Sequence, residues 1–343
     1  DGTELAISES QERMAVVISK EDREKFIEAA HEENLEATQV ATITDTGRLR
    51  MTWRGKVIVD ISREFLNTNG VTQHINVTVV SPMDIKSIPG ELTPGTEELS
   101  QIWISNLKSL NCCSQKGLVE RFDSTVGAGT VLMPFGGKYQ LSPAEGMAAK
   151  LPVMHGDTTT CTLMTHGFNP KISSWSPFHG AVYAIVEAIT KIAAMGGDYK
   201  KIRLSLQEYF EKPGKEPKRW GKPFSALLGA YYAQMKLGIP SIGGKDSMSG
   251  TFKDMDVPPT LVAFAVAVSD TDKVISTEFK RPGRQVVLLE TEKDNNMLPV
   301  FEQLDRNLTR IHELVLAGKI LSAHSIRQGG IAEAISKMCF GNM

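Results

Sequence analysis

Apolar and polar positions alternate along most of the chain in the manner of an α/β protein. Three runs rich in apolar and β-branched residues predict strands: Thr158–Met164, Ile202–Leu206 and Thr260–Ser269. Val182–Met195 is apolar on nearly every face, which is typical of a buried helix, and Gly196-Gly197 provides a left-handed end. Phe224–Leu237 predicts a second helix that stops at Gly238. Together these elements make residues 121–270 the most regular part of the sequence.

The region before this unit predicts a β-α-β-β layer over residues 13–62. Its elements are a strand at Met14–Ile18, a helix at Glu21–Glu33 and strands at Gln39–Ile43, Arg48–Trp53 and Lys56–Ile61. Ser19 and Asp22 form a Ser-x-x-acid capping pattern before the helix. The layer has no evident start, so we expect it to be the end of a domain.

A connector follows this layer, and a further α/β unit follows residue 270. Proline and glycine interrupt residues 81–120, where only Glu97–Asn111 predicts a helix. The last region predicts a strand, a helix, a strand and a helix at Gln285–Glu290, Asn307–Gly318, Ile320–Ala323 and Ile331–Met338. Because such a unit is incomplete, we expect the chain to be a segment of a longer protein.

Composition narrows the function classes. The 343 residues contain 38 Lys and Arg against 40 Asp and Glu, a formal net charge of -2. A nucleic-acid-binding surface normally shows as an excess of basic residues, so we expect no nucleic-acid partner. The hydrophobic fraction of 41% is sufficient for a packed core, and no apolar run reaches the ~18 residues of a membrane helix. The four cysteines lack zinc spacing, and we expect free thiols in a cytoplasmic protein.

The glycine-rich segment Gly243–Gly250, with the sequence GGKDSMSG, carries the strongest chemical signal. Its glycines allow backbone N–H groups to approach an anion, and Lys245 adds a positive charge suited to phosphate. Asp246 offers the oxygen ligands that Mg²⁺ prefers, and Ser247 and Ser249 add hydroxyls. The segment is not a Walker A motif, and a polar turn at the end of a strand has the same composition.

Glu187 is the second signal, because it is a carboxylate in an otherwise apolar helix. A buried carboxylate needs a partner. Lys191 lies four residues later and predicts an ordinary helical ion pair, while a metal ligand is the alternative. From the residues alone, the ion pair is the favoured interpretation.

Several motifs together resemble the phosphoribosylformylglycinamidine synthase family, also called formylglycinamide ribonucleotide amidotransferase. They occur in the order expected of the family and span nearly the whole chain: SESQERM at 8–14, WRGKVIVD at 53–60, QEYF at 207–210, GGKDSMSG at 243–250, VPPTLVAFAV at 257–266 and AHSIRQGGIAEAISKM at 323–338. The resemblance implies a ligase of the fourth step of purine biosynthesis. Such a ligase makes formylglycinamidine ribonucleotide from formylglycinamide ribonucleotide, ATP and glutamine, with ATP and Mg²⁺ as cofactors. The partner that supplies ammonia would be a glutaminase domain in the same polypeptide.

The resemblance also implies a fold of halves similar to aminoimidazole ribonucleotide synthetase. The synthetase core of the family resembles two fused copies of that enzyme. Each copy has an N-terminal α/β half, which contributes to a shared β-barrel, and a C-terminal α/β half. We expect the end of a first C-terminal half at residues 1–80, a linker at 81–120, a second N-terminal half at 121–270 and the start of its C-terminal half at 271–343. The catalytic histidine and the glutaminase triad of the family would lie outside this chain, so we expect the fragment alone to be inactive.

Site residues follow from the matched motifs. The resemblance implies substrate binding by Glu9, Ser10, Gln11 and Ser249, nucleotide binding by Gly243, Gly244, Lys245 and Ser247, and metal binding by Asp246, Glu187 and Glu145. It implies no catalytic residue within this chain.

Two departures from the family pattern affect the implied metal site. Lys191 stands where the family has an asparagine, and an ammonium there would repel Mg²⁺ and neutralise Glu187. The family motif His-Asp-x-Ser-x-Gly-Gly reads HSIRQGG at residues 324–330. We therefore expect an altered or metal-free nucleotide site.

Two other function classes remain open at this point. One is a free-standing ATP-dependent synthetase of the aminoimidazole ribonucleotide synthetase superfamily, and the other is a non-catalytic nucleotide-binding module. Because the family pairs two related N-terminal halves, a homodimer of this chain is a further expectation.

Overall fold

The chain folds into two compact units, Asp1–His74 and Ile75–Met343. The computed structural model describes residues 2–8, 12–68, 72, 74–82, 88–89, 98–122 and 124–342. The predicted division at residues 80, 120 and 270 is finer than these two units and stays a prediction.

In its described residues, the first unit contains a β-hairpin and three helices. Its elements are α1 (Gly2–Ala6), α2 (Arg23–Glu32), β1 (Arg48–Trp53), β2 (Lys56–Ser62) and α3 (Arg63–Asn67). Strands β1 and β2 are antiparallel, and Arg54 and Gly55 at their turn both have positive φ angles. On the hairpin, the Asp60 carboxylate lies 2.5 Å from Arg48 Nε and 2.9 Å from Arg50 Nη2. These ion pairs join the two strands.

Two predicted strands of this unit are wrong. The structure assigns no strand to Met14–Ile18 or Gln39–Ile43, although the hairpin strands and the helix were predicted within two residues. A strand exists only through hydrogen bonds to a neighbouring strand. Val17 and Val40 are 79% and 87% exposed, so these apolar runs have no buried sheet face to occupy.

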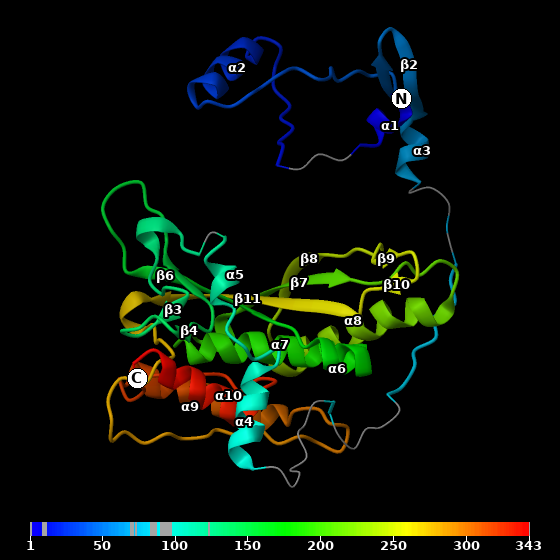
Figure 1. Ribbon diagram of the computed structural model, residues 1–343. Coiled ribbons are helices and arrows are strands. Elements are labelled where there is room, and N and C mark those ends of the chain that lie inside the picture. The colour runs from blue at the N-terminus through cyan, green and yellow to red at the C-terminus, as the bar shows by residue number, and fades with distance from the viewer. Residues whose placement is uncertain are drawn as a thin grey trace. The chain divides into compact units, whose positions relative to one another are not determined.

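The second unit is built on a mixed five-stranded sheet within the described residues (Figure 1). The sheet strands are β5 (Met147–Lys150), β6 (Thr160–Gly167), β7 (Arg203–Tyr209), β8 (Ser241–Lys245) and β11 (Thr260–Asp270), in the order β5-β6-β11-β7-β8. The pair β7 and β8 is parallel and the other pairs are antiparallel. The short strands are β3 (Phe135–Gly136), β4 (Ser142–Pro143), β9 (Thr251–Phe252) and β10 (Met255–Asp256).

The helices of this unit follow from local sequence signals. They are α4 (Leu99–Lys108), α5 (Lys116–Val119), α6 (Pro170–Trp175), α7 (Pro177–Ala194), α8 (Pro217–Leu237), α9 (Phe301–Leu316) and α10 (Gly330–Phe340), with 3-10 turns at Gly127–Gly129, Tyr199–Lys201 and Thr271–Lys273. Helix α7 begins earlier than predicted because Ser176 accepts a hydrogen bond from the His179 N–H and Pro177 fits the first turn. It ends before Gly196, whose φ is 97°.

Helices α7 and α8 cover one face of the sheet and form the core with it (Figure 1). Strand β6 alternates buried and more exposed residues, so its inward side chains, such as Leu163, pack on α7. Ala184, Ile185, Ala188 and Ile189 of α7 are fully buried, as the all-apolar helix pattern predicts. On the other side of the helices, α9 packs against both α7 and α8. Helix α7 therefore lies between the sheet and α9.

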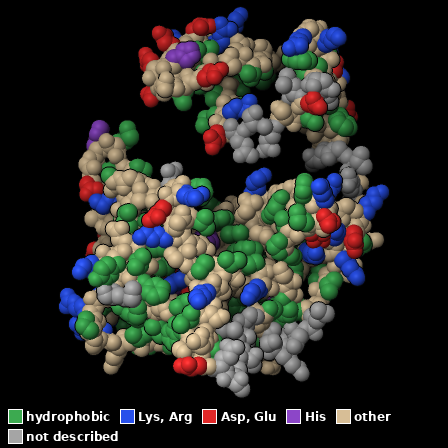
Figure 2. All heavy atoms as spheres, in the orientation of Figure 1, with side chains coloured by type: hydrophobic (Ala, Val, Ile, Leu, Met, Phe, Trp, Pro, Cys, Tyr) green, Lys and Arg blue, Asp and Glu red, His purple; other side chains and the backbone are tan. Residues whose placement is uncertain are grey.

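The opposite face of the sheet leaves apolar side chains exposed. Met164 and Phe264 are each 42% exposed, and Val268 is 59% exposed. Figure 2 shows exposed hydrophobic side chains among charged side chains of both signs on the visible face. The sheet is open within the described residues, and the predicted strands Gln285–Glu290 and Ile320–Ala323 are wrong, since no strand is assigned there.

All four cysteines are free, and Cys161 is buried in β6 as a small apolar residue. None of the described helices combines the length and hydropathy required to cross a bilayer.

Candidate functional site

The glycine-rich segment begins as a strand rather than a loop. Gly243, Gly244 and Lys245 are the last residues of β8, which runs parallel to β7 at the edge of the sheet. A Cβ atom on Gly244 would lie 2.0 Å from the Leu206 carbonyl oxygen, so close strand packing alone requires this glycine. Gly243, Gly244 and Lys245 are exposed, so they remain accessible to a ligand.

The register of β7 and β8 continues beyond the end of β8. Lys245 pairs with Gln207, the Ser247 N–H donates to the Glu208 carbonyl at 3.1 Å, and the Phe210 N–H donates to the Ser247 carbonyl at 2.9 Å. Asp246 therefore stands beside Glu208. Since neighbouring residues of parallel strands direct their side chains to the same face, the two carboxylates are neighbours.

The neighbouring Asp246 carboxylate affects the pKa of Glu208. Burial raises the pKa of Glu208, and the Asp246 charge raises it further, to about 7. Glu208 was not predicted as a site residue, although it lies in the QEYF motif. Glu208 is identified only by the register of the parallel strands β7 and β8, which cannot be read from one sequence. At neutral pH the pair can hold a proton or accept a cation.

Glu187 and Lys191 form the ion pair that the helical spacing predicts. Lys191 Nζ lies 2.5 Å from Glu187 Oε1 and donates to the His166 carbonyl at 2.8 Å. The Lys191 side chain is only 2% exposed. The close approach of β6 to α7 creates this environment, because a Cβ atom on Gly167 would lie 2.1 Å from the Ala184 carbonyl oxygen.

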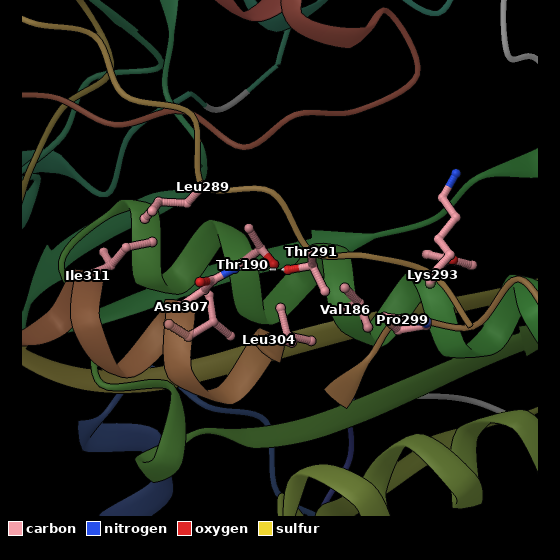
Figure 3. A pocket seen from close by; sticks show the side chains of 11 residues that line it. Val186, Thr190, Leu289, Thr291, Lys293, Pro299, Leu304, Asn307 and Ile311 are labelled. Carbon is pink, nitrogen blue, oxygen red and sulfur yellow. Dashed lines mark hydrogen bonds between the residues drawn. The ribbon is translucent and has the colours of Figure 1, made fainter. Parts of the chain in front are cut away.

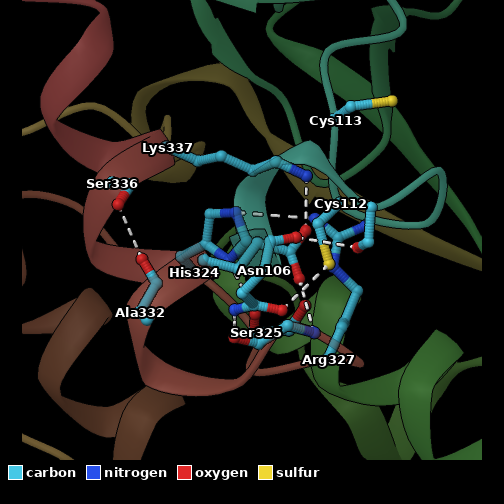
Figure 4. A network of polar contacts seen from close by, with 12 residues as sticks. Asn106, Cys112, Cys113, His324, Ser325, Arg327, Ala332, Ser336 and Lys337 are labelled. Atoms are coloured by element: carbon cyan, nitrogen blue, oxygen red, sulfur yellow. Dashed lines mark hydrogen bonds and ion pairs between the residues drawn. The ribbon is translucent and has the colours of Figure 1, made fainter. Parts of the chain in front are cut away.

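Glu145 is buried in a second polar cluster, formed with the HSIRQGG motif (Figure 4). Its Oε2 atom accepts hydrogen bonds from the Ser325 N–H at 3.3 Å and from the Ser325 hydroxyl. Its Oε1 atom lies 3.3 Å from His324 Nδ1 and 3.7 Å from Arg327 Nη2. Burial would raise the pKa of Glu145, but His324, Arg327, Ser325 and Lys191 outweigh it and hold the pKa below its usual range.

Helix α4, within the predicted linker, supports the same motif from outside. Asn106 Nδ2 donates to the Gly329 carbonyl at 2.7 Å, and Trp103 Nε1 donates to Ser336 Oγ of α10 at 2.9 Å. Figure 4 shows Asn106 and Cys112 beside Ser325 and Arg327. The Gly329 N–H donates to Glu333 Oε2 at 2.9 Å, so the start of α10 is capped by its own chain.

The predicted metal ligands divide between these places. Glu145 and Glu187 are both near Lys191, whereas Asp246 interacts with Glu208. Among the described residues, no group of three His, Cys, Asp or Glu side chains could hold a metal ion. Each of Glu145 and Glu187 already has a cationic partner, so these two do not fit a divalent cation. The predicted substrate residues Glu9, Ser10 and Gln11 lie outside the described residues.

A cavity of about 150 Å³ lies between α7, α9 and the segment that precedes α9 (Figure 3). Its walls are mostly apolar and include Val186, Leu304 and Ile311. Asn307 Nδ2 is already used, since it donates to the Glu290 carbonyl and to Thr291 Oγ1 at 2.9 Å and 3.3 Å. None of the predicted site residues lines this cavity.

Comparison with known proteins supports the family resemblance over almost the entire chain. The chain is 27% identical to the phosphoribosylformylglycinamidine synthase subunit PurL of Thermoplasma volcanium and to that of Thermoplasma acidophilum, in each case over 99% of its own length. It spans about half the length of these curated relatives, 46% in both. Residues 1–54 match the family model described as AIR synthase related protein, C-terminal domain.

Solved structures show the same fold. PurL of Thermotoga maritima complexed with AMPPCP matches 97% of this chain and 50% of its own, with a TM-score of 0.62 and 18% identity. The same protein complexed with FGAR matches 96% of this chain and 47% of its own, with a TM-score of 0.61 and 19% identity. The predicted mixed α/β fold, similar to the synthetase halves of this family, is confirmed.

Proposed function

We propose that this chain is part of the synthetase component of an ATP-dependent ligase that makes formylglycinamidine ribonucleotide. The ligase would consume formylglycinamide ribonucleotide, ATP and glutamine and release ADP, phosphate and glutamate, in purine biosynthesis. The observation that carries this proposal is the match to PurL subunits over 99% of the chain. Thermotoga maritima PurL complexed with ATP and with FGAR has the same fold, which supports both substrates.

The exposed end of β8 is the part of this chain that we assign to the nucleotide. Gly243, Gly244 and Ser247 would offer backbone N–H groups and a hydroxyl to phosphate, and Lys245 a positive charge. Asp246 is the candidate ligand for Mg²⁺, because Glu208 beside it is a second carboxylate, and the Asp246 charge acts on it. When bound, Mg²⁺ would offset the phosphate charge. Ser249, whose hydroxyl lies 2.8 Å from that of Ser247, would face the ribonucleotide. Substrate binding by Glu9, Ser10 and Gln11 stays a prediction.

The partners of this activity are also proposals. The assembly "PurLQS from Thermotoga maritima" has the same fold over 80% of this chain, which supports a partner that supplies ammonia from glutamine. A glutaminase domain in the same polypeptide is the form that we propose, in a cytoplasmic enzyme. The exposed apolar face with Met164, Phe264 and Val268 would favour a homodimer of the chain, which light scattering would detect.

Complementation tests the proposed function. A bacterium without its own PurL requires purines, and the open reading frame that contains this chain should restore its growth. Replacement of Lys245 and Asp246 by alanine in that frame should abolish the rescue, while Lys236→Ala, at an exposed position of helix α8, should not. Failure of the unchanged frame to restore growth would contradict the proposal and favour a non-catalytic nucleotide-binding module.

A second assay separates the ligase from a free-standing synthetase. The purified 343-residue chain is supplied with formylglycinamide ribonucleotide, ATP, Mg²⁺ and ammonium in place of glutamine. We expect no turnover, because the resemblance assigns the catalytic histidine to a region outside this chain. Formation of formylglycinamidine ribonucleotide by the chain alone would show that it is a complete synthetase.

A further inference from the structure

Lys191 occupies the interior of a cluster that otherwise has the carboxylates of a metal site. Its ammonium is 2.5 Å from Glu187 Oε1 and donates to the His166 carbonyl, and the side chain is 2% exposed. A buried ammonium is costly unless a negative charge and hydrogen-bond acceptors compensate it. The Glu187 carboxylate supplies the negative charge and the His166 carbonyl supplies an acceptor, so the burial of the ammonium is compensated.

Glu145 is compensated in the same way from the other side. Two hydrogen bonds from Ser325 occupy its Oε2 atom. Its Oε1 atom accepts no hydrogen bond within the described structure, but it faces His324 Nδ1 and Arg327 Nη2. The Lys191 charge also acts on this carboxylate. A metal ion that approached Oε1 would therefore meet positive groups on Arg327 and Lys191.

The charges of the cluster balance without any ion. The two carboxylates of Glu145 and Glu187 face the fixed positive charges of Lys191 and Arg327, and His324 adds a further positive charge when protonated. A divalent cation would leave the buried cluster with an excess of two positive charges. Repulsion between like charges is strong in such a poorly solvated region.

We propose that Lys191 takes the place of a divalent cation in this cluster, which is held together by its own side chains and binds no Mg²⁺. The ammonium does what a metal ion would do structurally: it fixes the Glu187 carboxylate on α7 against the end of β6. This inference goes beyond the proposed function, because it concerns the chain alone and its test uses no substrate.

The wild-type chain tests the proposal directly. Mn²⁺ broadens the NMR signals of nuclei close to its binding site, so the ring signals of His166 and His324 report on this cluster. We expect both rings to keep their line widths when Mn²⁺ is added. Broadening of these two rings at Mn²⁺ concentrations that leave the exposed His31 and His74 unaffected would overturn the proposal.

A gain of metal binding tests the same point from the opposite side. Lys191→Asn removes the ammonium and adds an amide oxygen beside Glu187, so we expect it to acquire a Mn²⁺ site at least ten-fold tighter than any in the wild type. Its melting temperature should rise with Mg²⁺ by more than that of the wild type, in which Mg²⁺ would bind at Asp246 and not at this cluster. The double variant Lys191→Asn/Glu187→Gln should lose the new site, and Lys236→Asn on α8 should gain none.

The outcomes of the variant experiment are distinct from those of complementation. A folded Lys191→Asn chain that binds Mn²⁺ no better than the wild type would overturn the proposal. If this variant does not fold without metal but folds when Mg²⁺ is present, the proposal is supported in its strongest form. If it folds in neither condition, the proposal is tested by the line widths of the His166 and His324 rings of the wild type with Mn²⁺.

Discussion

The ammonium of Lys191 lies 2.5 Å from the carboxylate of Glu187, one helical turn before it on α7, and only 2% of the lysine side chain is exposed. Most i, i+4 pairs are on helix surfaces, where they contribute about 0.3–0.5 kcal/mol. Here the lysine cannot exchange its partner for water. The same spacing that predicts a weak surface pair therefore forms a buried one.

Removing one member of this pair should cost more than removing both charges. Glu187→Gln leaves the buried ammonium without its main counter-charge, and we expect it to lower the free energy of unfolding by about 2–3 kcal/mol, below the usual range of 3–5 kcal/mol because Glu187 is 21% exposed. The double variant Glu187→Gln/Lys191→Met should recover at least half of the loss. Urea denaturation measures both, and a double variant no more stable than Glu187→Gln would show that the charges are not coupled.

Helix α8 should tolerate no side chain at Gly229. A Cβ atom there would lie 2.2 Å from the Phe178 carbonyl oxygen of α7, so Gly229→Ala should force the two helices apart and cost about 1–3 kcal/mol. Gly117→Ala is the matched control, because this glycine is also helical and has no heavy atom within 4 Å of the added Cβ. The control should gain up to about 1 kcal/mol from helix propensity. Thermal unfolding compares them, and equal melting temperatures would contradict the close packing.

The elements predicted correctly from the sequence are those whose own residues determine their environment. Helix α7 is apolar all round and β11 is a continuous apolar run, so each must be buried wherever the chain places it. The strands predicted at 14–18, 39–43, 285–290 and 320–323 depend instead on a neighbouring strand. A pattern of apolar residues cannot show whether that neighbour is present.

The same distinction applies to the candidate site: contacts within one element can be predicted from the sequence, and contacts between distant elements cannot. The Glu187–Lys191 pair was predictable because both residues are on one helix at a fixed spacing. The contact between Glu145 and Ser325 joins positions 180 residues apart, and only the resemblance to a family suggested that both belong to one site. Glu208 became a site residue through the register of β7 and β8, which is a property of the fold.

Asn106 should hold the HSIRQGG motif in place from helix α4. Asn106→Ala removes the donor to the Gly329 carbonyl, so we expect a loss of about 1 kcal/mol in the free energy of unfolding. Amide hydrogen exchange should become faster at residues 324–330 in particular. A loss in the free energy of global unfolding alone would not confine the effect to these residues. Gln101→Ala, at an exposed position of the same helix, should leave this exchange unchanged. Equal exchange rates in the two variants would show that the motif is held by α10 alone.

Glu208 should make the stability of the chain depend on pH near neutrality. Its pKa of about 7 in the folded chain is above the ordinary glutamate value of 4.5, so the folded state holds the proton more tightly than the unfolded state. The stabilisation from this proton is complete below about pH 4.5 and is lost as the pH rises through about 7. Glu208→Gln keeps a neutral side chain at every pH, so it should stabilise the chain above pH 7 relative to the wild type.

The size of this effect is limited because Glu208 is only partly buried. We expect Glu208→Gln to gain about 1 kcal/mol at pH 8, or about 2–4 °C in melting temperature, and nothing at pH 4.5. Asp246→Asn should move the midpoint of the wild-type stability change to lower pH, because it removes the charge that raises the Glu208 pKa together with burial. Melting temperatures from pH 4.5 to 8.5 measure both effects. If the difference between Glu208→Gln and the wild type is the same at every pH, Glu208 does not titrate in this range and the paired-carboxylate interpretation of the β7–β8 edge is wrong.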